Sequence, residues 1–515
     1  MGTGGRQIAK AAVIVMALFA LSRLLGVVRQ MVIAAQFGTS GDLDAYMAAA
    51  RIPEMIFLVV AGGALGSAFI PAFADHLARD DRAGAWRLAS AVANLVVIVL
   101  TVAAALIAVF APVLVRTLIA PGFDAEQQAL TVSLLRLMLL SSVIFGASGV
   151  VMGALNAHQH FVFPALAPSL YNLSIVGGTL LLGSRLGVRG IAVGVVAGSA
   201  LHLLVQVPVL LRRGARYVPT LGLTIPGVRE VVRLMAPRVL GTAITQINFV
   251  VNNNLASTMG EGAVSAINYA WLLMLLPQGV LAQAIGTAAF PTFARQVAQG
   301  ERDEMRGTLA ATLRTVFFLS IPATVGLLAL GQPLVGILFE RGAFDQSSTA
   351  EVAWALAFFA LGLVGHSGLE IIARAFYALH DTFTPVWVGG LAMALNLALS
   401  LTLPGAFASQ GWMRHGGLAL ANSVATLLET GVLLALIRRR LGGIEDRRLL
   451  AACARSGLAA LAMGAALLGW RALLADAPAL LVAGGGVVLG AAFYLGAAVL
   501  LRAEELRAVV RLVRR

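Results

Sequence analysis

Cysteine is almost absent from this chain: Cys453 is the only one in 515 residues. A single cysteine cannot form a disulfide within the chain, and it excludes the paired-cysteine motifs of zinc and redox sites. We expect Cys453 to lie in a membrane span as a small apolar side chain. Charged residues are scarce as well, at 12% of the sequence against about 25% in soluble domains. This composition argues against an ordinary soluble protein.

Several catalytic motifs are also missing. The sequence has no G-x-x-x-x-G-K-[ST] loop, so no P-loop ATPase is built into it, and it has neither H-E-x-x-H nor G-x-S-x-G. His366 and Glu370 are spaced to form a polar pair on one helix, but a metal site would need a third ligand. We therefore expect no catalytic residue, no cofactor and no bound metal, and we predict that the protein is not an enzyme.

Apolar runs dominate what is present, because hydrophobic residues make up 59% of the chain. A membrane span needs about 20 apolar residues, and the runs between polar breaks predict about fourteen spans. The sequence therefore predicts an all-α, polytopic membrane protein. The approximate centres of the spans fall near residues 22, 65, 103, 141, 173, 200, 244, 280, 322, 363, 394, 425, 461 and 490.

The net charge of +13 would suit a nucleic-acid binder, but the arginines are distributed otherwise. If the N-terminus is cytoplasmic, the predicted inner segments hold most of them, and the outer segments hold few. This positive-inside bias predicts that both termini are cytoplasmic. The basic C-terminal tail suits an anionic lipid surface, so we expect membrane lipids as partners and no nucleic acid.

The chain contains an internal repeat. The stretch Gly66–Ala74 recurs as Gly286–Ala294, and Phe123-Asp124 recurs as Phe344-Asp345. A shift of six helices restores the same orientation, so we expect parallel repeats with a binding site between them near the membrane midplane. The predicted organisation is an N-terminal lobe at 1–220, a second lobe at 221–442, and two further helices with a basic tail at 443–515. The arginine-rich loop at 212–233 is the predicted linker.

Two arginines in the first span, Arg23 and Arg29, carry the functional prediction. A charge at the bilayer centre costs roughly 2.5–3.5 kcal/mol, and a guanidinium cannot lose its proton. Both therefore need a polar cavity, a counter-charge or an anionic ligand. Six residues of helix separate them by about 9 Å and about 120°, so they could line a broad cavity. The pattern indicates a transporter of an anionic molecule.

The next predicted helix adds charge to the same lobe, with Asp44, Arg51 and Glu54. Arg51 and Glu54 are spaced to pair on one face of a helix, and we expect Asp44 to reach an arginine of the first helix. Asp42 is a plausible N-cap. The predicted substrate-binding residues are Arg23, Arg29, Asp44 and Arg51.

Other roles remain open for these residues. Arg23 could snorkel to the membrane surface, and Arg29 and Arg51 could lie near helix ends among lipid headgroups. Pro53 removes a backbone donor from the second helix and is therefore a predicted hinge position. Gly26, in the first span, is the other predicted hinge position. The asparagine run 252–254 is expected to end its helix outside the membrane.

With these residues in view, the chain resembles the MurJ (MviN) lipid II flippases of the multidrug/oligosaccharidyl-lipid/polysaccharide exporter superfamily. The stretches that carry the resemblance are Ser22–Gly26 with Arg29, Phe37-Gly38, Asp44-Ala45, Pro53, Gly63-Ala64, Ala68–Pro71, Phe161–Pro168 with Asn172, Gly279–Pro291, Arg341-Gly342 and Phe376–Pro385. Arg23, Arg29 and Asp44 match functional positions of the family, and Arg51 matches a basic one.

The resemblance implies fourteen helices, two lobes, a cationic central cavity and a groove for a polyprenyl tail beside the last two helices. The implied substrate is lipid II, the undecaprenyl-pyrophosphate-linked peptidoglycan precursor. It would be moved from the inner to the outer leaflet of the bacterial plasma membrane by alternating access, for cell-wall synthesis. The cell-wall synthesis machinery is an implied partner.

Three positions depart from the family pattern. Phe57, Gly62 and Leu272 stand where the family usually carries charge, and Arg238 could compensate. The lobe 2 sodium site of some members is not expected, because its carboxylates are missing. These departures leave a different polyprenyl-linked glycan, or a drug/cation antiporter of the same superfamily, as alternatives. A non-transporting scaffold of the cell-wall machinery is a further alternative.

Overall fold

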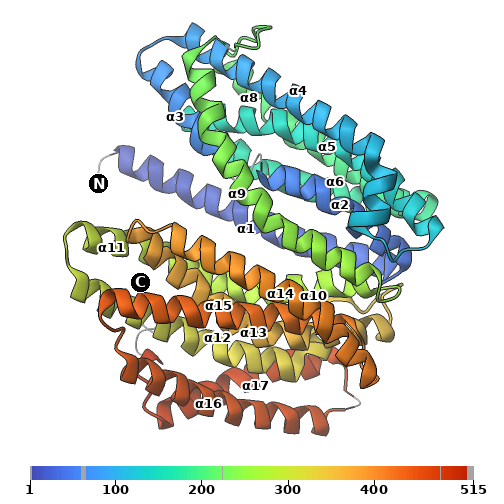
Figure 1. Ribbon diagram of the computed structural model, residues 1–515, viewed down its shortest axis with the longest axis vertical. Helices are drawn as coiled ribbons and strands as arrows, with labels where there is room; N and C mark the ends of the chain where they lie inside the picture. The colour runs from blue at the N-terminus through green and yellow to red at the C-terminus, as the bar shows by residue number, and fades with distance from the viewer. Residues whose placement is uncertain (1–2, 60–64, 223, 476, 507–515) are drawn as a thin grey trace. The chain divides into compact units, whose positions relative to one another are not determined.

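The computed structural model consists of helices joined by turns and short irregular segments over the residues it describes, which are 3–59, 65–222, 224–475 and 477–506 (Figure 1). Within these ranges, the side chains of 3–12, 59, 65, 67, 226, 236–245 and 247 are not described. The chain forms two compact units, each treated by itself below. The first unit holds residues 1–264 and 341–344, and the second holds 265–340 and 345–515.

The first unit is built from long helices joined by short turns. Its elements are α1 (Thr3–Phe37), α2 (Gly41–Val59), α3 (Leu65–Ala78), α4 (Arg82–Leu114), the π-helix η2 (Val115–Ile119), α5 (Ala125–Ala157), α6 (Val162–Leu186), α7 (Val188–Leu204), α8 (Val207–Arg212) and α9 (Pro226–Ser257). Aromatic residues of α3 and α4, among them Phe69, Phe73 and Trp86, form a core with α5 and α9.

The second unit continues in the same manner. Its elements are α10 (Ala263–Gln278), the π-helix η3 (Gly279–Gln283), α11 (Ala284–Ala298), α12 (Arg302–Phe339), α13 (Gln346–Ala378), α14 (Phe383–Ser409), α15 (His415–Leu441), α16 (Asp446–Leu473) and α17 (Ala479–Leu500). One core joins α11, α12, α13 and α15, and another joins α12 to α16 and α17.

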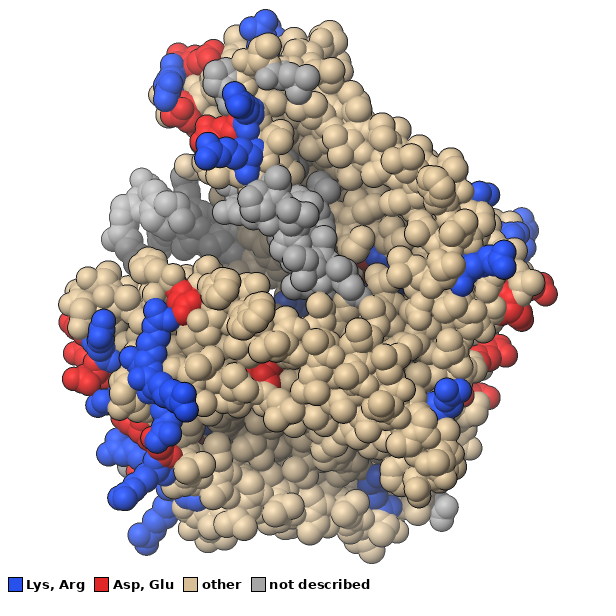
Figure 2. All heavy atoms as spheres, viewed as in Figure 1, with Lys and Arg blue, Asp and Glu red and all other residues tan. Residues whose placement is uncertain are grey.

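The prediction of an all-α membrane protein is confirmed. In the described part of the chain, twelve helical stretches are long and apolar enough to span a membrane. The predicted spans near residues 65 and 244 are not in this set: the first falls on α2 and α3, and the second is the asparagine-bearing α9. Figure 2 shows charged side chains gathered toward the helix ends, with wide uncharged surface between them.

The internal repeat reappears in the helices. Asp124 and Asp345 are the N-caps of α5 and α13, each of 33 residues, and each accepts a hydrogen bond from a backbone N–H three residues on. The turns that follow have left-handed residues at matching places, Gln159 and His380. The boundary between units falls after Val264 because α9 packs against α2, α3 and α4. The lobe limits at residues 220 and 442 stay predictions.

The predicted linker is held against the first unit. Tyr217 donates to Asn94 Oδ1 at 3.0 Å, and the Val218 N–H donates to Ser90 Oγ at 3.0 Å. Asn94 in turn donates to the carbonyl of Thr220 at 2.8 Å. The irregular segment before α9 is therefore fastened to α4 rather than free.

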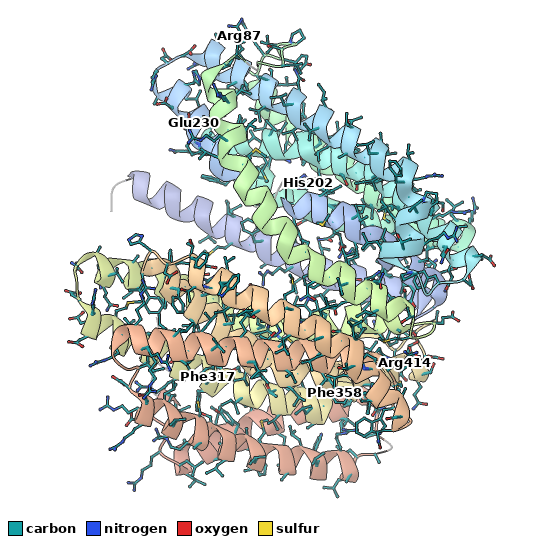
Figure 3. All side chains as sticks on the ribbon, viewed as in Figure 1. Arg87, His202, Glu230, Phe317, Phe358 and Arg414 are labelled. Carbon is teal, nitrogen blue, oxygen red and sulfur yellow. The ribbon has the colours of Figure 1, made fainter. Side chains whose placement is uncertain are left out.

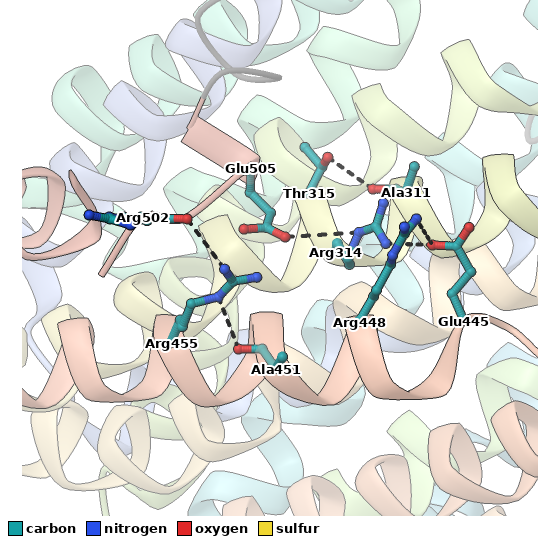
Figure 4. A network of polar contacts seen from close by, with 9 residues as sticks. All are labelled: Ala311, Arg314, Thr315, Glu445, Arg448, Ala451, Arg455, Arg502 and Glu505. Carbon is teal, nitrogen blue, oxygen red and sulfur yellow. Dashed lines mark hydrogen bonds and ion pairs between the residues drawn. The ribbon is translucent and has the colours of Figure 1, made fainter. Parts of the chain in front are cut away.

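The last two helices are attached to α12 by polar contacts (Figure 4). Arg314 of α12 contacts Glu445 Oε2 at 2.6 Å and Glu505 Oε1 at 3.9 Å. At the far end of α17, Arg455 donates to the carbonyl of Arg502 at 3.3 Å. Cys453 lies half-buried on α16, packed against apolar side chains as expected.

Candidate anion-binding site

The two arginines of α1 have guanidinium groups without described acceptors. Arg23 is exposed and makes no hydrogen bond or ion pair within the described part of the structure. Arg29 is half-buried, and its Nε is sealed from solvent without an acceptor. A buried N–H without an acceptor costs free energy, so binding of a ligand that supplies an acceptor is favoured.

Arg29 shares its surroundings with two phenols and an acid. Tyr46 of α2 and Tyr171 of α6 both lie close enough to Arg29 and Glu54 to interact with them electrostatically. The neighbour of Tyr171, Asn172, donates to the Ser22 carbonyl at 3.2 Å, directly before Arg23. The Asn172 bond places the charged stretch of α1 against α6.

Arg51 of α2 completes this group of arginines. Its Nη1 lies 3.5 Å from Glu54 Oε2, which confirms the predicted pair, and its guanidinium lies 5.6 Å from the ring centre of Phe249 on α9. Its Nε is buried without an acceptor. Because Glu54 is 56% exposed, water screens its charge, so the pair neutralises Arg51 only weakly. The group of Arg23, Arg29 and Arg51 is therefore net positive.

Asp44 has a different partner from the arginine that the sequence led us to expect. It is fully buried, and its Oδ2 accepts a hydrogen bond from the Gly262 N–H at 2.8 Å. Glu261 reaches back in the same way, accepting from the Gly41 N–H at 2.8 Å. These reciprocal bonds fix the start of α2 to the turn after α9.

The predicted N-cap of α2 is wrong by two residues. The helix begins at Gly41, and the Ser40 side chain accepts from the Leu43 N–H at 3.4 Å. Asp42 lies inside the first turn, where its negative charge favours the positive end of the helix. Both hinge candidates lie within helices, Gly26 in α1 and Pro53 in α2, and their motion stays a prediction.

The asparagine run belongs to α9, close to its end, and it serves a structural purpose. Asn253 donates to the Ile119 carbonyl at 3.1 Å, and Asn254 donates to the Leu118 carbonyl at 2.7 Å. Both acceptors lie in η2, whose wider turn leaves carbonyl groups in need of donors. These asparagines therefore join α9 to the end of α4.

Phe57, at a position where charge was expected, lies in an aromatic cluster. Its ring centre is 4.4 Å from that of Phe145, which also contacts Tyr171 and His202. His202 is buried among the helices of the first unit (Figure 3) and bonds to Ser148 Oγ at 2.7 Å. No spacing in the sequence predicts this cluster around Phe57 and Phe145. Leu272 is half-buried in α10, whereas Gly62 and the side chain of Arg238 lie outside the described residues.

In the second unit, the suggested pair of His366 with Glu370 is not formed. His366 Nε2 bonds to Asn422 Oδ1 at 3.1 Å, and Glu370 pairs with Arg374 at 2.6 Å. Arg374 also donates to the Gln283 carbonyl in η3 at 3.3 Å. Among the described residues, no group of three or more His, Cys, Asp or Glu side chains could hold a metal ion.

An arginine group with unpaired donors, set in an apolar helical unit, suits a phosphate-bearing ligand. A family described as "Lipid II flippase MurJ" matches residues 33–477. The chain belongs to the MurJ family. The curated "Lipid II flippase MurJ" of Burkholderia cenocepacia is 32% identical over 437 residues, covering 82% of each chain. The "Probable lipid II flippase MurJ" of Rhizobium meliloti is 32% identical and covers 87% of this chain and 83% of its own length.

Solved structures agree on the fold. A MurJ structure described as the inward closed conformation matches with a TM-score of 0.80 and 24% identity, covering 95% of this chain and 99% of its own. An inward-facing multidrug resistance MATE transporter of the MOP superfamily matches with a TM-score of 0.69 and 15% identity, covering 84% of this chain and 99% of its own. The chain is thus a multi-pass membrane protein of the MurJ family with a MOP-superfamily fold.

Proposed function

We propose that this protein is a lipid II flippase, which carries the undecaprenyl-pyrophosphate-linked precursor from the inner to the outer leaflet. The observation that carries the proposal is the arginine group of the first unit, with donors on Arg29 and Arg51 that have no described acceptor. Membership of a family described as lipid II flippases supports the same substrate.

The physical need for such a site is clear. A pyrophosphate with a sugar and peptide cannot cross hydrocarbon unaided, because each unpaired polar group costs several kcal/mol there. Arg23 and Arg29 would hold the diphosphate by charge-assisted hydrogen bonds, and Arg51 would extend the cationic surface. Asp44, through its bond with Gly262, would keep the start of α2 in place beside them.

The proposed cycle is alternating access of two lobes, at 1–220 and 221–442, with residues 443–515 as the added helices and tail. Gly26 and Pro53 would absorb bending of the helices that carry the arginines. The protein would sit in the bacterial plasma membrane with both termini cytoplasmic, as the arginine distribution indicates. The cell-wall synthesis machinery that consumes lipid II would be its partner.

One observation favours a second candidate, another polyprenyl-linked glycan as substrate. Phe57 and Leu272 are apolar where the family usually carries charge, and Phe57 is packed on Phe145. A cavity with fewer cations would hold the diphosphate less strongly and select more by the sugar portion.

Complementation tests the proposed function. Cells depleted of their own lipid II flippase should be rescued by the wild-type chain, with lipid II exposed at the outer face. Arg23→Ala and Arg29→Ala should abolish both readouts at normal expression. Arg79→Ala is the matched control, because this arginine forms only an exposed pair with Asp75, and it should leave rescue intact. Failure of a well-expressed wild type to rescue would favour the second substrate.

A further inference from the structure

Glu429 is an acid in the middle of a membrane-spanning helix. It lies fifteenth of the 27 residues of α15, about 20 Å from either end of a helix that rises 1.5 Å per residue. It is the only acidic residue of α14 and α15. Its side chain is half-buried, and it makes no hydrogen bond or ion pair within the described part of the second unit.

The side chain of Glu429 points toward α14 at a glycine. A Cβ added to Gly389 would lie 3.2 Å from Glu429 Oε1, so the missing side chain leaves room for the carboxylate. The helix α14 contains no titratable residue at all. Gly389 thus leaves space beside the Glu429 carboxylate, but it supplies neither a counter-charge nor a hydrogen-bonding side chain.

The other helices packed against α15 carry charges that are paired or lie near the starts of their helices. On α13, Glu351 lies in the second turn, Glu370 is paired with Arg374, and His366 is bonded to Asn422. The phenol of Tyr377 lies near Glu370 and Glu429. On α12, Arg314 is paired with Glu445, and the remaining charges are Arg302, Asp303, Glu304 and Arg306 in its first turns. On α15 itself, the other titratable groups are His415 at the start and Arg438, Arg439 and Arg440 at the end.

An ionised carboxylate in this position is costly, because neither lipid nor a counter-charge stabilises it. A proton or a cation removes that cost. A metal ion needs several oxygen ligands, whereas Glu429 has no described partner and faces a glycine. A proton needs only the carboxylate, so the surroundings of Glu429 favour H⁺ over a metal cation.

We propose that Glu429 binds and releases a proton during each transport cycle, and that an inward proton flow is coupled to outward movement of the substrate. The carboxylate takes H⁺ from hydronium at the outer side, leaving water and a neutral acid, and returns it to water at the inner side. The coupling rests on the transport activity proposed above, whereas proton binding by Glu429 does not depend on it.

Infrared spectroscopy tests proton binding without any substrate. The purified full-length protein in nanodiscs should show a carboxylic-acid carbonyl band that grows as the pH is lowered. One component of this band should be missing in Glu429→Gln and shifted in Glu429→Asp. The same component should be retained in Glu304→Gln, which changes an exposed acid at the start of α12. A difference spectrum of Glu429→Gln identical to that of the wild type would overturn the proposal.

Coupling is tested in liposomes that contain lipid II, with the outer pH one unit below the inner pH. If one proton moves per cycle, this tenfold gradient biases the final distribution of lipid II by up to tenfold. Wild type and Glu304→Gln should show the bias, and Glu429→Gln should lose it while still binding lipid II. An unchanged bias in Glu429→Gln overturns the coupling. Absence of flipping in wild type, with the infrared band present, counts against the transport function alone.

Discussion

At the scale of single residues, the proposed diphosphate site rests on arginines whose partners are incomplete. Arg29 and Arg51 each keep a buried N–H without a described acceptor. The choice of arginine fits this state, because its planar group holds its charge and matches two phosphate oxygens at once. The sequence alone located these arginines, since a charge in an apolar run is visible without a structure.

The partner of Asp44, by contrast, could not be predicted from the sequence. It bonds to Gly262, which lies 218 residues further along the chain. Backbone N–H groups look alike in a sequence, so only the fold reveals which of them meets a given carboxylate. The prediction of the N-cap of α2 was wrong for a different reason. Ser40 and Asp42 lie two residues apart, and both have side chains that can cap a helix.

Asp381, in the turn before α14, gives a prediction about pH. It accepts from the Thr384 N–H at 2.9 Å and pairs with Arg440, and the hydrogen bond from Thr384 is the main cause that lowers the pKa of this carboxyl. A lowered pKa stabilises the fold above the unfolded value of about 3.9, and this contribution disappears as the pH falls through the folded value. Asp381→Asn should therefore lower the unfolding temperature near neutral pH and show less further loss below about pH 4.

The measurement is thermal unfolding of the purified protein in detergent across this acid range. Asp303→Asn is the control, since that side chain is exposed and its pair with Arg306 is at 3.3 Å on the surface. A loss of stability in acid that is the same for Asp381→Asn and wild type would contradict this account of Asp381.

At the scale of helices, α6 and α7 are packed more closely than their sequences suggest. A Cβ on Gly178 would lie 2.6 Å from the Gly190 carbonyl oxygen and 2.7 Å from Gly194 Cα. These backbones meet only because all three residues lack side chains, the arrangement that small residues allow between membrane helices.

Gly178→Ala should therefore destabilise the protein by about 1–3 kcal/mol, because backbone rather than a flexible side chain must move. The adjacent Gly177→Ala is a matched control, as nothing lies within 4 Å of a Cβ there. Helix propensity makes that control neutral or slightly stabilising. Denaturant or thermal unfolding of both variants decides the matter, and equal behaviour of the two would refute close packing at Gly178.

Which helices exist was largely predictable, and where they deviate was not. Long apolar runs and acidic caps such as Asp124 and Asp345 are local signals. The π-helix η2 instead depends on Asn253 and Asn254, which donate to it from a helix more than a hundred residues later. A sequence pattern of period 3.6 carries no information about such long-range donors.

At the scale of the whole molecule, the ionic contacts of Arg314 join α12 to residues before α16 and after α17. This side chain is 16% exposed and contacts Glu445 and Glu505. Arg314→Met leaves two acids without their shared cation, and breaking a buried pair in this way costs about 3–5 kcal/mol. We therefore expect faster hydrogen exchange throughout α16 and α17 in this variant.

Arg448→Met is the control for that prediction. Arg448 approaches the same Glu445 at 3.6 Å but is 72% exposed, so its loss should cost at most about 1 kcal/mol. Equal exchange rates in the two variants would show that Arg314 does not hold the last two helices.

The repeat was predictable at this scale because duplicated motifs survive in the sequence. The unit boundary after Val264 was not, because it depends on which neighbours α9 contacts. The arginines of the proposed site are visible in the sequence, whereas the phenols, asparagines and Phe57 cluster of the first unit could not be predicted from it.

The contacts of Arg314 also have a consequence for how the protein is made. Arg314 leaves the ribosome about 190 residues before Glu505, which at about 5–20 residues per second is roughly 10–40 s. Throughout that interval α12 stands in the membrane with a cation whose full set of acids has not yet been synthesised. A chain truncated after α15 lacks both Glu445 and Glu505, so it presents an arginine without these two acids to the insertion machinery and to membrane proteases.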